Sequence, residues 1–160
     1  MGLDITAYRK IIRIELPEGT EPYNYRAFTA CLNGDFPGRA DDITDGAVYL
    51  KSEEFHFRAG SYSGYGEWRR RLAGLAGYVD PEAVWNGGVA TGPFFELINF
   101  SDCEGIIGTS VSAKLAKDFA DHEHAALGVD GPDSEWFVAK YAEWKKAFEI
   151  AADGGCVDFH

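Results

Sequence analysis

The sequence predicts an α+β fold in a single domain, residues 1–160, with a mainly antiparallel sheet and about three helices packed on one of its faces. Extended patterns are grouped at the start of the chain, and helical patterns fall mostly after them. The two kinds therefore do not alternate strictly, as a doubly wound parallel sheet requires. A length of 160 residues is ordinary for one domain with its own core.

The first extended segment runs from Leu3 to Leu16, where apolar and polar residues alternate with a slip near Arg9 and Lys10. One long strand or two short strands fit this pattern, and the slip could be a β-bulge. A turn follows at 17–22, because its prolines fix φ and its glycine accepts positive φ. A second strand is expected over 25–32.

Residues 33–46 are polar and rich in Gly and Asp, which predicts a long surface loop. Two short extended runs follow at 48–50 and 55–57, and the polar residues between them could form the tip of a hairpin. Residues 78–93 contain two prolines and several glycines, so irregular structure is expected there, with Val84 and Trp85 docked on the core.

Three later segments carry apolar residues that fall on one face of a helix at 100° per residue. These residues are Tyr65, Trp68, Leu72 and Leu75, then Val111, Leu115, Phe119 and Ala126, then Phe137, Tyr141, Trp144, Phe148 and Ala151. Ser63 is the expected N-cap of the first helix and Thr109 or Ser110 that of the second. The third helix is expected to begin at Asp133 or Ser134.

The segment from Phe94 to Ala126 is expected to organise the fold. An apolar strand at 94–100 leads into a polar loop, and that loop opens the second long helix. The chain closes with a short strand at 156–160, whose apolar residues share one face.

Composition and charge restrict the classes of partner. The chain is 46% hydrophobic and 14% aromatic, which favours a packed core over disorder. The net charge is −11, and residues 81–160 carry five basic against fourteen acidic side chains. An acidic surface is repelled by phosphate backbones and anionic lipids, so neither nucleic acid nor membrane is expected as a partner.

The three cysteines, Cys31, Cys103 and Cys156, cannot all pair with one another and show no CxxC spacing. A reducing cytoplasm is the compartment that this predicts. No secretory signal pattern opens the sequence, and no apolar run approaches the ~18 residues of a membrane span.

The first candidate site is a junction between a Gly, Ser and Tyr loop and a helix. Backbone N–H groups at such a helix start, beside arginines, suit an anionic group such as phosphate, and tyrosines can stack on a planar ring. The plainer alternative is that the glycines shape a turn, Ser63 caps, and the aromatic residues are core. The predicted ligand-binding residues here are Arg58, Ser61, Tyr62, Ser63, Tyr65 and Arg69.

The second candidate site is the loop carrying Ser101, Asp102 and Glu104. Because Asp102 and Glu104 alternate, both carboxylates can point the same way in an extended loop, toward a metal, an amine or a sugar hydroxyl. They can equally favour the positive end of the following helix or accept from loop N–H groups. Two carboxylates lack a third ligand, so no metal site is predicted, and the cofactor is left open.

The histidines argue against a metal enzyme. On a helix, His122 and His124 lie about 200° apart and cannot share an ion, and no HExxH motif is present. An intrahelical hydrogen bond between His122 and Asp118 is expected instead. His56 and His160 fall in extended segments, and their partners cannot be identified from the pattern.

Four phrases of the sequence carry a resemblance. They are MGLDITAY, RAGSYSGYGEWRRRLAGLAGY, FFELINFSDCEGIIGTSVSAKLAKDFA and WKKAFEIAADGGCVDFH. Together they resemble a family of small proteins from tailed bacteriophages and bacterial genomes to which no activity, fold or catalytic residue is assigned. The resemblance implies a phage or prophage origin and a location in the bacterial cytoplasm, and it carries over no functional residue.

Three functions are consistent with these observations. The favoured hypothesis is a non-enzymatic domain that binds a small anionic, ring-containing, nucleotide-like ligand at the two junctions together, sequestering a host signal. The second is a hydrolase that uses Asp102 and Glu104 with His56 or His160. The third is a protein-interaction module whose acidic second half contacts a host protein. The oligomeric state is left open.

Overall fold

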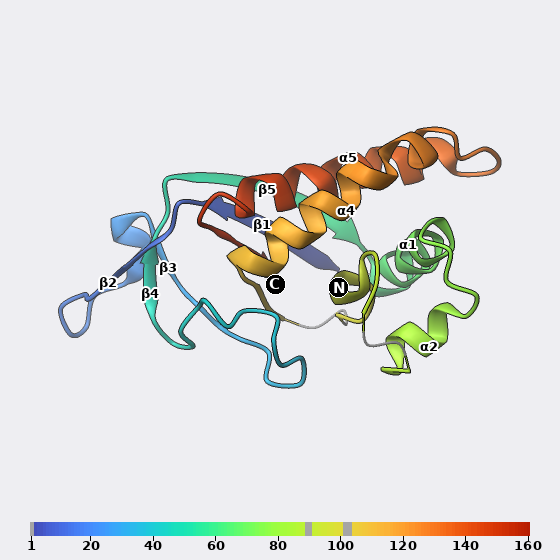
Figure 1. Ribbon diagram of the computed structural model, residues 1–160. Coiled ribbons are helices and arrows are strands. Elements are labelled where there is room, and N and C mark those ends of the chain that lie inside the picture. Colours follow the sequence, from blue (N-terminus) through green and yellow to red (C-terminus); the bar gives the residue numbers. More distant parts are fainter. Residues whose placement is uncertain (1, 89–90, 101–103) are drawn as a thin grey trace.

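The computed structural model describes residues 2–88, 91–100 and 104–160 and confirms the α+β class (Figure 1). The helices are α1 (Tyr62–Leu75), α2 (Pro81–Trp85), α3 (Phe95–Ile98), α4 (Thr109–Leu127) and α5 (Ser134–Ala151), with a 3-10 turn η1 (Pro22–Tyr25). The strands are β1 (Leu3–Arg9), β2 (Ile12–Ile14), β3 (Ala27–Thr29), β4 (Val48–Leu50), β5 (Glu53–Gly60), β6 (Gly105–Ile107) and β7 (Cys156–Phe159).

The strands form two antiparallel sheets. The larger sheet has the order β5-β1-β7-β6, and the smaller has the order β2-β4-β3. The chain passes from the larger to the smaller sheet between β1 and β2, where Lys10 adopts a positive φ of 47°. The slip in the sequence pattern is therefore a break between two short strands in different sheets.

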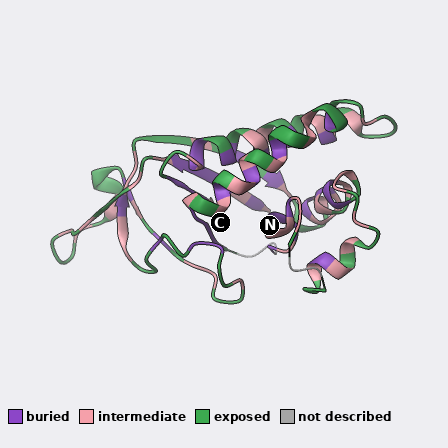
Figure 2. Cartoon of the chain, viewed as in Figure 1, coloured by how far each residue is buried: buried purple, intermediate pink, exposed green. Residues whose placement is uncertain are grey.

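Helices α1, α4 and α5 cover one face of the larger sheet (Figure 1). Alternate residues of β1, Leu3, Ile5 and Ala7, point into this core and are at most 2% exposed. Trp144 of α5 lies at the centre, with its ring 4.9 Å from that of Phe57 and 5.2 Å from that of Trp68. Figure 2 shows the buried residues concentrated between the sheet and these helices.

The opposite face of the larger sheet is covered only in part. A second apolar cluster joins this face to the smaller sheet and to the loops beside it, through Tyr8, Ala30, Ala40, Ile43, Tyr49, Ile106 and Cys156. The remaining positions on the same face are polar. The candidate site lies on this uncovered polar part of the sheet.

The three predicted long helices are confirmed, and every apolar residue predicted to face the core in α5 is buried. Two caps differ from the prediction. Ser61 rather than Ser63 caps α1, because the Ser61 Oγ accepts from the Gly64 N–H at 3.1 Å. Helix α4 begins after Gly108, and the Asp42 carboxylate accepts from the Ser110 N–H at 3.0 Å.

The predicted strand at 94–100 is wrong. Phe94 adopts a positive φ of 56° and starts the short helix α3, and the strand is β6, which begins at Gly105. Phe94, Leu97, Ile98 and Phe100 are all fully buried. Phe95, Glu96 and Asn99 are only partly buried, and a run of seven residues is too short for its period to distinguish a short helix from a strand in the sequence.

Three smaller predictions are also corrected. Residues 48–50 and 55–57 do not form a hairpin, because β4 pairs with β2 and β3 whereas β5 pairs with β1. The strand expected over 25–32 is confined to β3 and follows the turn η1. The expected irregular segment at 78–93 contains α2, whose Val84 is fully buried as predicted. Among the described residues, no helix is long and apolar enough to span a membrane.

Candidate functional site

Strand pairing places four charged or titratable residues in one row across the uncovered face of the larger sheet. Asp4 of β1 lies opposite Arg58 of β5, with the Arg58 Nη1 3.5 Å from the Asp4 Oδ1. On its other side, the Asp4 backbone exchanges two hydrogen bonds with His160. Gly105 pairs with Phe159, so the next step of that register sets Glu104 opposite His160. The row is therefore Arg58, Asp4, His160 and Glu104.

Thr6 joins two histidines in front of this row. Its side chain is only 2% exposed, and its Oγ1 lies 3.0 Å from the His56 Nδ1 and 2.8 Å from the His160 Nε2. The other ring nitrogen of His56, Nε2, lies 3.4 Å from the Glu54 Oε1. Glu54, His56, Thr6 and His160 thus form one hydrogen-bonded chain, which we call the relay.

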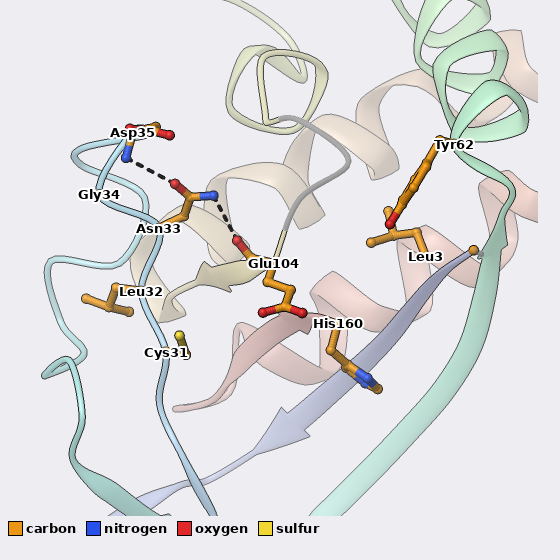
Figure 3. A pocket seen from close by; sticks show the side chains of 10 residues that line it. Leu3, Cys31, Leu32, Asn33, Gly34, Asp35, Tyr62, Glu104 and His160 are labelled. Atoms are coloured by element: carbon orange, nitrogen blue, oxygen red, sulfur yellow. Dashed lines mark hydrogen bonds between the residues drawn. The ribbon is translucent and has the colours of Figure 1, made fainter.

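A cavity of about 690 Å³ opens at the end of the row where Glu104 and His160 lie (Figure 3). The loop 31–35 forms one wall, and Tyr62 at the start of α1 forms the opposite wall. Asn33 ties the loop to the sheet, because its Nδ2 donates to the Glu104 carbonyl at 2.8 Å while its Oδ1 accepts from the Asp35 N–H at 3.0 Å. The lining residues are Gly2, Leu3, Cys31, Leu32, Asn33, Gly34, Asp35, Tyr62, Glu104 and His160.

The charges of this cavity are arranged unevenly. Its lining contains the carboxylates of Asp35 and Glu104 and no lysine or arginine among the described residues. Arg58 lies beside the lining residue Gly2, because a β-carbon at Gly2 would lie 2.0 Å from the Arg58 Nη2. The lining of the cavity therefore offers the carboxylates of Asp35 and Glu104 as hydrogen-bond acceptors, and Arg58 at the rim offers a positive charge.

Asp158 of β7 lies on the same sheet face, opposite Thr6 on one side and Ile106 on the other. Burial, and secondarily the neighbouring Glu104 carboxylate, raises the pKa of Asp158 to about 7. The same face raises the pKa of Tyr8 above its ordinary value, mainly by burial and then by the charge of Asp158. Asp158 therefore carries a carboxyl group with a raised pKa close to the carboxyl group of Glu104.

Of the residues predicted from sequence to bind a ligand, Tyr62 and Glu104 line the cavity and Arg58 lies at its rim. Ser61 caps α1, and the Ser63 Oγ lies 3.1 Å from the Ser61 Oγ. The predicted residues Ser101 and Asp102 lie outside the described residues.

Tyr65 and Arg69, which were also predicted to bind a ligand, join α1 to the end of the segment that contains α3. Tyr65 is fully buried, and its hydroxyl donates to the Phe100 carbonyl at 3.1 Å. The Arg69 Nη1 donates to the carbonyls of Ile98 and Phe100, each at 3.1 Å. These bonds hold the start of α1 beside Ile98 and Phe100, and neither Tyr65 nor Arg69 is among the residues that line the cavity.

Sequence reasoning did not identify Thr6, Asn33, Asp35 or Asp158. Thr6 and Asp158 occupy ordinary alternating strand positions, and only the strand order reveals that they share a face with the histidines. Asn33 and Asp35 belong to a loop whose composition predicts nothing more specific than exposure. The one sequence signal for this face is the polar residue at every second position of the first and last strands, β1 and β7.

The remaining histidine prediction is confirmed, with one refinement. The His122 Nδ1 lies 2.9 Å from the Asp118 backbone carbonyl, so the intrahelical bond uses the backbone oxygen. Within the part of the chain that the structure describes, no three His, Cys, Asp or Glu side chains gather as a metal site requires. The chain matches no protein-family model, no curated protein and no solved structure.

Proposed function

We propose that the protein binds, without altering it chemically, a small ring-containing ligand that carries an anionic group and is therefore nucleotide-like. The observation that carries this proposal is that Tyr62 and Glu104 face one cavity of about 690 Å³, a volume suited to a small molecule. A partly exposed tyrosine ring offers a stacking surface for a planar ring. Arg58 at the rim can pair with a phosphate or carboxylate that stays near solvent.

We also propose where the protein acts. The resemblance to proteins of tailed bacteriophages is consistent with a phage or prophage product that acts in the bacterial cytoplasm by sequestering a host signalling nucleotide. In that role the protein needs no catalytic machinery, because binding alone lowers the concentration of free ligand. It also needs neither nucleic acid nor membrane as a partner.

A thermal-shift screen with nucleoside monophosphates and triphosphates tests the proposal, alongside native mass spectrometry of protein purified from cells. A nucleotide present at a hundredfold excess over its Kd is expected to stabilise the fold by about 2.7 kcal/mol. Tyr62→Ala should abolish this shift, whereas Tyr23→Ala, at a 75% exposed tyrosine in η1, is the matched control and should retain it. Absence of any shift across the panel contradicts the proposal and favours a host protein partner.

Hydrolysis is a second candidate function, because Glu104 and His160 face the same cavity beside the carboxyl group of Asp158. A carboxyl group with a raised pKa beside a second carboxyl group and an imidazole is an arrangement that supports general acid and base chemistry. Turnover of p-nitrophenyl esters, phosphates or glycosides by the wild type, lost in both Glu104→Gln and His160→Asn, would establish this function. Equal turnover by wild type and variants would exclude a role for these residues.

A further inference from the structure

The donor and the acceptor of each hydrogen bond in the relay can be assigned, starting from Glu54. A carboxylate can only accept a hydrogen bond, so the Glu54 Oε1 requires a proton on the His56 Nε2. When His56 is neutral, its Nδ1 then carries no proton and accepts from the Thr6 hydroxyl. Thr6 has a single proton, so its oxygen must accept from the His160 Nε2–H.

The bond with Thr6 determines which nitrogen of His160 carries the proton, and His160 lines the cavity. With its one proton on Nε2, a neutral His160 leaves Nδ1 as a bare hydrogen-bond acceptor. His160 lines the cavity, and Glu104, its neighbour across the row, adds a carboxylate that also only accepts. In Figure 3 the side chain of Glu104, just before β6, extends toward His160.

We infer that the floor of this cavity, formed by Glu104 and His160, selects a ring whose edge carries two neighbouring N–H donors. The inference rests on the proposed function and specifies the ligand's recognised edge. A base of the guanine type has this edge, since its ring N–H and its exocyclic amine are adjacent donors. A hypoxanthine ring has the same shape and lacks the amine, and an adenine ring presents an acceptor beside its amine.

Each part of such a ligand would contact a different part of the site. The ring stacks on Tyr62, its donor edge meets Glu104 and His160, and its phosphate remains at the rim near Arg58. The carboxylates of Asp35 and Glu104, which line the cavity, would repel a phosphate placed beside them, so this orientation is the one that the charges favour. Thr6 is a positioning residue in this arrangement, because it acts on the ligand only through His160.

Calorimetric titration with guanosine 5′-monophosphate and inosine 5′-monophosphate tests the inference. The guanine nucleotide is expected to bind at least about tenfold more tightly, which is the usual contribution of a well-formed pair of base contacts. Thr6→Val, which removes the hydroxyl and keeps the branched shape, should reduce this preference, and Thr6→Ser should retain it. A merely structural role of Thr6 would weaken both nucleotides equally and leave their ratio unchanged.

The possible outcomes separate the two claims. If both nucleotides bind equally and Tyr62→Ala weakens both, the inference fails and the proposed function stands. If neither binds, the proposed function fails for nucleotide rings and the inference fails with it.

The relay can also be tested in the protein alone. Imidazole ¹⁵N shifts recorded at about pH 8.5, where histidines are generally neutral, should report a proton on Nε2 of His160 in the wild type. Thr6→Val should remove this tautomer preference and Thr6→Ser should preserve it. A wild-type His160 with its proton on Nδ1 overturns the direction of the relay and the acceptor floor derived from it.

Discussion

Replacing Asp158 with asparagine should change how the stability of the fold depends on pH. Burial among the strands of the larger sheet, with Glu104 nearby, raises the pKa of Asp158 from its ordinary 3.8 to about 7. Between these two values the folded protein holds a proton on Asp158 that the unfolded chain has lost. The stabilising contribution is therefore fully present below about pH 4 and disappears as the pH rises through about 7.

The size of the effect follows from the pKa difference. Each pKa unit corresponds to about 1.4 kcal/mol, so this one carboxyl group makes the wild type lose about 4 kcal/mol between pH 4 and pH 8. Asparagine does not titrate, so Asp158→Asn lacks this loss. The free energy of unfolding of the variant should therefore rise relative to that of the wild type as the pH increases.

Urea denaturation followed by tryptophan fluorescence at several pH values between 4 and 8 measures this difference. Because all other groups titrate in both proteins, their contributions largely cancel in the comparison. Asp130→Asn, at an exposed carboxylate, controls for the loss of one negative charge from a chain of net charge −11. A difference between wild type and Asp158→Asn that stays constant within about 1 kcal/mol across this range would refute the reasoning.

Three further substitutions test the packing and the caps, each by chemical denaturation. Ser61→Ala removes the side-chain acceptor of the Gly64 N–H and should destabilise the fold by about 1 kcal/mol; an unchanged midpoint would show that the cap contributes nothing. Phe119→Ala, at a fully buried ring, should cost roughly 3–5 kcal/mol, and a loss below about 1 would contradict the described core. Gly74→Ala should stabilise α1 by up to about 1 kcal/mol, because a β-carbon there meets no atom within 4 Å, and destabilisation would indicate a different local packing.

The helices could be predicted from the sequence because their apolar stripes repeat over several turns. Trp144 and its partners along α5 occur at steps that only a helix places on one face, and they are all buried. The segment around Leu97 could not be assigned in the same way, because its apolar run is too short for its period to separate a short helix from a strand. A local pattern identifies an element only where it repeats over several turns or several alternations.

The candidate site was predictable in part, for a different reason. Tyr62 and Glu104 were identified because loop-to-helix and strand-to-loop junctions expose backbone groups beside polar side chains. The relay through Thr6 depends on β1 lying between β5 and β7, and strand order is set by contacts distant in sequence. The cap at Ser61 differs from the expected Ser63 by two residues, which is within the usual uncertainty of helix boundaries.

An NMR titration of ¹⁵N-labelled protein with guanosine 5′-monophosphate, following the backbone amide shifts, tests the proposed binding site most directly. We expect the largest changes at Asn33, Tyr62, Glu104 and His160, which line the cavity. Tyr62→Ala should remove these changes. Changes confined to the outer faces of α4 and α5, or no changes at millimolar nucleotide, would contradict the claim that this cavity is the ligand-binding site.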